Sequence, residues 1–173
     1  MKAITALAAL LALTAPPAFA DVDEIRLGLA NHDISFLGHG KEGGVDIGAE
    51  VLFQSPELLK SLWSPRPHVG VSVNTEGDTS QLYAGLSWQF QPVEPLFIEF
   101  SLGGAVHNGT LNSSDPDVKQ LGSRALFRES VSLGWHVTER HSVMLTFDHE
   151  SNAGLADHNA GLNNFGLRWG YRF

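Results

Sequence analysis

The chain of 173 residues contains no cysteine, which excludes disulfide bonds, thiolate metal sites and thiol catalysis. It is also poor in charge, because Lys, Arg, Asp and Glu make up only 17% of it, against about a quarter in a typical soluble domain. Basic residues are scarce, 11 against 19 acidic ones, and the net charge of −8 argues against nucleic acid as a partner. The length suits a single domain with a substantial core.

Long apolar runs are missing after the first twenty residues. The N-terminal stretch has Lys2, an apolar run at residues 4–13 and then Ala18-Phe19-Ala20, which is typical of a signal-peptide cleavage site. We therefore predict a signal peptide at residues 1–20 and a mature domain at residues 21–173. Nothing in the mature chain approaches the roughly 20 apolar residues of a spanning helix. Export of a chain without cysteine favours a bacterial envelope protein.

Apolar and polar residues alternate with period two through most of the mature chain, which predicts β-strands. The clearest segment places Phe165, Leu167, Trp169, Tyr171 and Phe173 on one face and Gly166, Arg168, Gly170 and Arg172 on the other. Similar segments lie at residues 25–30, 45–53, 69–74, 82–90, 96–103, 127–137 and 142–148. The sequence thus predicts eight strands.

The predicted connections alternate in length. Polar and mostly long ones span residues 31–44, 74–80, 108–124 and 152–164, whereas tight turns are expected at residues 91–95 and 138–141. The stretch Ser55–Arg66 is an exception, in which Ser55 and Pro56 predict the N-cap and first residue of a short helix. Long connections at one end and short turns at the other are typical of outer-membrane barrels.

The two faces of the strands differ in bulk, and this predicts which one meets lipid. An eight-stranded barrel has an interior just wide enough to be filled by side chains. The face with Gly, Ser and charges such as Arg26 and Glu99 fits that interior, and the face with Trp88, Trp135 and Trp169 then points outward. The predicted fold is an all-β, eight-stranded antiparallel transmembrane β-barrel in the bacterial outer membrane. The alternative is a soluble lipocalin-like barrel with its apolar face inward.

Two residues with catalytic chemistry share the outward face near the external end of the seventh strand. His149 and Ser151 are two residues apart and have the same parity as Phe147, so their side chains are neighbours. A serine nucleophile needs a base to take its proton, and histidine is the usual one. The alternative is that both are ordinary polar residues at a strand end.

The stretch His149-x-Ser151-Asn152-Ala153-Gly154-Leu155 resembles the lipid A 3-O-deacylase family (PagL-type). These are eight-stranded outer-membrane esterases that remove the ester-linked acyl chain at position 3 of lipid A. The resemblance implies that lipopolysaccharide is the substrate, that Ser151 is the nucleophile and His149 the general base, and that Asn152 and Gly154 form the oxyanion hole. We expect no cofactor and no metal, and the sequence leaves open whether the barrel is a monomer or a homodimer.

The chain departs from the family at one position. The acidic member of the family's triad lies fourteen residues after the histidine, where this chain has Asn163. An amide can orient an imidazole but cannot stabilise its charged form as a carboxylate does. Glu129 is the preferred substitute because it shares the outward face, Asp157 is second, and Glu150 has inward parity. The alternative functions are a catalytically impaired or structural barrel, and a lipid-binding one.

Overall fold

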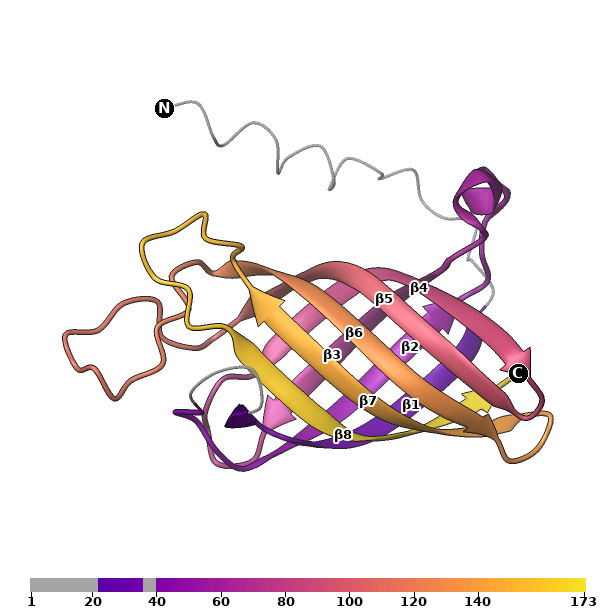
Figure 1. The fold of residues 1–173 in the computed structure, drawn as a ribbon, viewed down its shortest axis with the longest axis horizontal. Helices are drawn as coiled ribbons and strands as arrows, with labels where there is room; N and C mark the ends of the chain where they lie inside the picture. Colours follow the sequence, from indigo (N-terminus) through magenta and orange to yellow (C-terminus); the bar gives the residue numbers. More distant parts are fainter. Residues whose placement is uncertain (1–21, 36–39) are drawn as a thin grey trace.

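The computed structural model describes residues 22–35 and 40–173, so the predicted signal peptide lies outside the described residues. Eight antiparallel strands pair in chain order, and β1 also pairs with β8, which closes the barrel (Figure 1). The strands are β1 (Val22–Asn31), β2 (Val45–Phe53), β3 (Arg66–Asn74), β4 (Gln81–Val93), β5 (Leu96–His107), β6 (Ala125–His136), β7 (His141–Ser151) and β8 (Leu162–Arg172), with the short helix η3 (Glu57–Leu62) between β2 and β3. The predicted fold class is confirmed.

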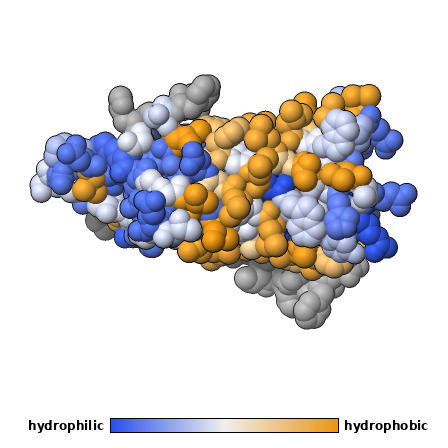
Figure 2. Space-filling view, turned by 90° about the horizontal axis from the view of Figure 1, so that it is seen from below, coloured by the Kyte–Doolittle hydropathy of each residue, from blue (hydrophilic) through white to orange (hydrophobic). Residues whose placement is uncertain are grey.

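The apolar face of the sheet points outward, as predicted. Leu27, Ile47 and Leu133 are each more than half exposed, whereas their polar neighbours along the strands are buried in the lumen. These outward residues form an apolar belt, which on the side shown in Figure 2 crosses the middle of the molecule between two more hydrophilic ends. The arrangement excludes the soluble lipocalin-like alternative and places the belt in lipid.

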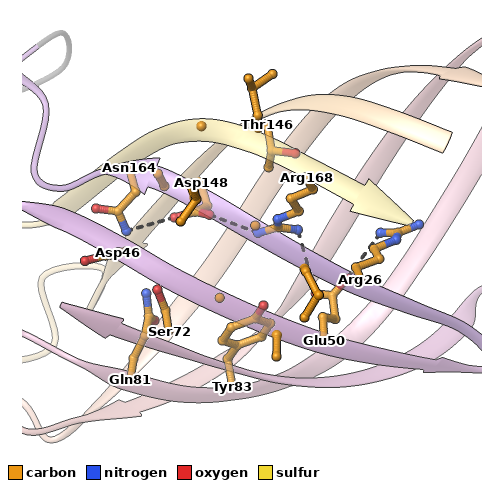
Figure 3. Close-up of a pocket in the computed structure, with 18 of the residues that line it drawn as sticks. Arg26, Asp46, Glu50, Ser72, Gln81, Tyr83, Thr146, Asp148, Asn164 and Arg168 are labelled. Atoms are coloured by element: carbon orange, nitrogen blue, oxygen red, sulfur yellow. Dashed lines mark hydrogen bonds and ion pairs between the residues drawn. The ribbon is translucent and has the colours of Figure 1, made fainter. Parts of the chain in front are cut away.

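Ion pairs fill the lumen. Arg26 is 1% exposed and contacts Glu24, Glu50 and Glu99 at 2.8, 3.2 and 2.6 Å. Buried charges are tolerated only when paired in this way. Toward the external end, Asp148 is shared by the guanidinium groups of Arg128 and Arg168. Between these groups lies a cavity of about 30 Å³ (Figure 3), which has room for about two water molecules.

The ends of the barrel differ as the loop lengths predicted. The two tight turns and the β2–β3 connection with η3 lie at the same end as the C-terminus, and the four polar connections lie at the other (Figure 1). By analogy with outer-membrane barrels, the first is the periplasmic end and the second the external end. Within the described residues, no helix has the length and apolarity needed to cross a membrane.

Several boundaries differ from the sequence-based expectation by a few residues, and three of the differences bear on the turns and the site. β8 begins at Leu162, inside the predicted loop, because Asn163 and Asn164 pair with β7 despite their low strand propensity. The turn between β4 and β5 is confined to residues 94–95, because pairing continues to Val93. The short helix is of the 3-10 type, and its N-cap is Pro56 rather than Ser55.

Candidate active site

The strand register brings the predicted site residues into one row on the outer wall. His149 of β7 pairs with Glu129 of β6 on one side and with Asn163 of β8 on the other. Opposite residues in neighbouring strands lie on the same face of the sheet. The polar row Glu129–His149–Asn163 therefore crosses three strands, near the external end and above the apolar belt.

Three apolar rows continue down the wall beneath the polar row. Their members are Val131, Phe147 and Phe165, then Leu133, Leu145 and Leu167, then Trp135, Val143 and Trp169. The row that holds Ser151 lies above, where Ser151 pairs with Phe127 of β6. The site is thus bounded below by lipid-facing side chains and above by the external loops.

One hydrogen bond orients the His149 ring. Its Nδ1 atom lies 2.7 Å from Oδ1 of Asn163. An amide oxygen is only an acceptor, so Nδ1 carries the proton and Nε2 keeps its lone pair. This is the tautomer that a general base requires. Asn163 is only 3% exposed, which shields the bond from competing water.

Ser151 is half-buried and follows His149 by two residues on the same face. Within residues 22–35 and 40–173, no hydrogen bond joins the two side chains. Contacts of this kind are often long in an enzyme without substrate and shorten in the complex. The geometry therefore places an oriented base beside a hydroxyl on a lipid-facing wall.

The candidate acids lie in three different surroundings. Glu129 faces His149 across the β6–β7 pairing, half-buried, and its carboxylate has no hydrogen bond or ion pair within the part of the chain that the structure describes. Asp157 is exposed in the loop between β7 and β8. Glu150 is 1% exposed and points into the lumen, where Arg128 lies 3.0 Å away. Of the three, the register brings only Glu129 next to the imidazole.

A tight turn at residues 152–155 contains both predicted oxyanion donors. Ala153 and Gly154 have φ angles of 54° and 75°, and the Leu155 N–H donates to the Asn152 carbonyl at 3.0 Å. Gly154 is exposed, and among the described residues its N–H has no acceptor. It is therefore free to bind an oxyanion.

Asn152 has a different environment. It is buried, its side-chain amide donates to the Leu121 and His158 carbonyls at 2.9 and 2.6 Å, and its backbone N–H donates to Asn159 Oδ1 at 2.9 Å. These bonds join the β5–β6 and β7–β8 loops and occupy its donors. Asn152 thus shapes the turn that presents Gly154.

Two contacts around His149 escaped the sequence analysis. Gly161 has a φ of 63°, and a Cβ at this position would lie 3.2 Å from the Cε1 atom of His149. The buried Lys119 ammonium holds the Gly161 carbonyl at 2.6 Å and Asp33 Oδ1 at 2.8 Å. Gly161 in the last predicted loop was a usable signal for a positive φ. Nothing in the sequence marks a single lysine in a long polar loop.

A charged cluster stabilises the external β1–β2 loop. The buried His32 ring lies 3.0 Å from Asp46 Oδ2 and 2.9 Å from Glu42 Oε2. Burial lowers the pKa of His32, but the hydrogen bonds and charges of the two carboxylates outweigh it and raise the pKa to about 9. His32 is therefore charged at neutral pH and bridges β1, β2 and the loop.

A closed eight-stranded barrel with a lipid-facing belt defines an outer-membrane protein, and its outward histidine–serine pair is the candidate active site. The family model described as lipid A 3-O-deacylase (PagL) matches residues 47–172. The chain belongs to this family and is an outer-membrane protein.

A curated relative, the lipid A deacylase PagL of Bordetella bronchiseptica, is 31% identical over 119 residues. The match covers 69% of this chain and 62% of the relative, so the chain spans less than two thirds of that protein's length.

Two solved structures share the fold. The crystal structure of the outer membrane enzyme PagL superposes with a TM-score of 0.64 at 17% identity, covering 87% of this chain and 99% of that one. The crystal structure of Neisserial surface protein A gives 0.58 at 12% identity, covering 87% and 96%. At these identities the likeness concerns the fold alone.

Proposed function

We propose that the protein hydrolyses the ester-linked acyl chain at position 3 of lipid A, within lipopolysaccharide of the outer leaflet. Family membership supports the reaction class. The observation that carries the proposal is the 2.7 Å hydrogen bond that His149 Nδ1–H donates to Asn163 Oδ1 on the lipid-facing side of the barrel. An imidazole on this outer face can reach a substrate in the membrane. It cannot reach one in the lumen, because the barrel wall lies between them.

In the first step, Nε2 of His149 takes the hydroxyl proton of Ser151 while the serine oxygen attacks the ester carbonyl. A bond forms between the serine oxygen and the acyl carbon, and the carbonyl oxygen becomes an oxyanion. The Gly154 N–H stabilises that charge, since it is exposed and unoccupied. Asn152 is not a donor in this proposal, because its own N–H groups are engaged in the loop contacts.

In the second step, the sugar oxygen leaves and takes the proton from the His149 imidazolium. Water then attacks the acyl-enzyme with His149 again as base, which releases the fatty acid and restores Ser151. Neither step requires a cofactor. The acyl chain lies along the apolar rows beneath the site, beginning with Val131, Phe147 and Phe165.

The charge of the imidazolium needs a partner that Asn163 does not supply. Glu129 lies across from His149 on β6, on the opposite side from Asn163. We assign Asn163 to orientation of the ring and Glu129 to electrostatic stabilisation of its charged form. The division predicts an active enzyme that is slower than one with a carboxylate at position 163.

The test is incubation of the detergent-purified barrel with lipopolysaccharide, followed by mass spectrometry of the lipid A. We expect loss of the single ester-linked acyl chain at position 3, and we expect Ser151→Ala to abolish it. Retention of every acyl chain across several detergents and pH values would contradict the proposal, provided that the protein migrates as a folded barrel when electrophoresed without heating.

The second candidate is a barrel that has kept the scaffold and lost the reaction. Asn163 is the observation in its favour, because the family has an acid there. It predicts that wild type and Ser151→Ala are equally inert, whereas restoration of activity by an acidic residue at position 163 would identify an impaired enzyme instead.

A further inference from the structure

The connection between β2 and β3 has an apolar surface that the fold leaves uncovered. Helix η3 buries none of its residues. Leu58 is 69% exposed, Leu62 is 49% exposed, and Trp63, which caps the helix, is 85% exposed. We call these three residues the η3 surface. Outside the membrane-facing wall, so large a group of exposed apolar side chains points to an interaction surface.

The backbone at Trp63 gives no reason for a tryptophan at this position. Trp63 has a φ of 62°, and its N–H bonds the Lys60 carbonyl at 3.2 Å to end the helix. Such left-handed C-terminal positions usually hold glycine, which adopts them without steric conflict. Because the backbone disfavours the side chain and no described part of the chain buries it, the indole is available for a contact outside the protein.

A hydrogen bond fixes the η3 surface beside the lipid-facing wall. The indole Nε1 of Trp88 donates to the Leu62 carbonyl at 2.7 Å. Trp88 lies on the outward face of β4 and packs against Phe100 of β5, with ring centroids 6.3 Å apart. In Figure 1, the purple η3 projects beyond the barrel wall at the periplasmic end. The η3 surface therefore adjoins the apolar belt on its outer side, near the periplasmic rim.

The position and the chemistry of this surface identify its occupant. It adjoins the periplasmic rim of a belt that is already in contact with lipid. Tryptophan concentrates at the boundary between acyl chains and head groups, where one edge of the ring is apolar and the N–H is wet. Lys60 and Glu57, 67% and 86% exposed, lie on the same short helix and remain in the head-group layer.

We propose that the η3 surface inserts into the interfacial layer of the inner, periplasm-facing leaflet and binds glycerophospholipid there. The segment is then a peripheral anchor on the outside of the barrel, which fixes the depth of the periplasmic rim. This role does not depend on the esterase activity, since it concerns the opposite end of the molecule.

The experiment uses the full barrel reconstituted into phosphatidylcholine vesicles, in which the lipid is brominated near the glycerol end of its acyl chains. The emission of Trp63 is obtained as the difference between wild type and Trp63→Phe. We expect loss of most of that emission in the brominated lipid and protection of it from aqueous iodide. Equal quenching of the two proteins by bromolipid, with iodide reaching Trp63 freely, would overturn the proposal.

A second set of variants separates lipid from a second copy of the chain. Leu58→Ser with Leu62→Ser is expected to shift the Trp63 emission to the red, whereas the matched control Leu155→Ser, 80% exposed at the external end, leaves it unchanged. Because the chain has no cysteine, Ser61→Cys places a single thiol on η3. Disulfide-linked dimers of this variant in the bilayer would show that another copy covers the surface, and the proposal would fall.

Discussion

Replacing Asn163 with aspartate tests the division of labour around His149. The two side chains have the same shape, so a carboxylate oxygen can take the place of Oδ1, 2.7 Å from Nδ1. The substitution adds a negative charge beside the imidazolium that forms during the reaction. We expect kcat to rise, because the added charge stabilises the transition state more than the ground state.

The magnitude follows from the separation of the charges. With charge centres about 4 Å apart, the attraction is about 1 kcal/mol in water and about 4 kcal/mol at an effective dielectric constant of about 20. At about 1.4 kcal/mol per factor of ten, these limits correspond to an increase in kcat of about fivefold to about a thousandfold. Asn163 is 3% exposed, which favours the upper part of the range and also imposes a desolvation cost on the new carboxylate.

The assay is the initial rate of acyl release from lipopolysaccharide by wild type, Asn163→Asp and Asn163→Leu. The leucine variant keeps the bulk and removes the hydrogen bond, so it should be slower than wild type. Each protein must show the folded mobility in an unheated gel before its rate is compared. An aspartate variant that is folded and no faster than wild type would refute the role of Asn163 as the residue that orients the His149 ring.

Three further results are expected. Glu129→Gln should lower kcat by about 3-fold to about 100-fold, as follows from a charge about 6 Å from the His149 ring between the same dielectric limits; an unchanged rate would remove Glu129 from the site. Gly161→Ala should lower kcat, and it should lower the free energy of unfolding in urea by about 1–2 kcal/mol, because Gly161 has a positive φ and lies against the His149 ring. Wild-type values for both quantities would contradict the contact between Gly161 and His149. The His32 pKa of about 9, raised from 6.5, implies up to about 3 kcal/mol of stability that is complete below pH 6.5 and lost as pH rises through 9. The protection factors of external-loop amides, which are corrected for base-catalysed intrinsic exchange, should therefore fall between pH 7 and 10 in wild type and not in His32→Gln, and identical pH profiles of protection would refute this.

The parity of side chains along the strands was sufficient to predict the barrel, the face of its sheet that meets lipid, and the outward positions of His149 and Ser151. A period of two is local information, and a slip of one residue would have reversed every face. Pairing across the sheet is not local. The row that joins Glu129 to His149 depends on the register between β6 and β7. The sequence indicated only that the two residues share the outward face.

The loops resisted sequence analysis for the same reason. Lys119 reaches the Gly161 carbonyl across 42 positions of the chain, and no periodic pattern marks such a contact. The family resemblance assigned Asn152 to the oxyanion hole, and no sequence pattern could show that the neighbouring loops engage its donors. The start of β8 was misplaced because asparagines are poor strand formers, yet cross-strand partners on β7 determine the pairing.

The spacing between the polar row and the tryptophans below it has a consequence for selectivity. Six residues separate His149 from Val143, whose row holds Trp135 and Trp169. At about 3.3 Å per residue and a tilt of about 45°, His149 stands roughly 14 Å higher along the membrane normal than Val143. In the proposed reaction, this height limits cleavage to ester bonds at one depth of the membrane, and the fatty acid is released inside the leaflet instead of in water.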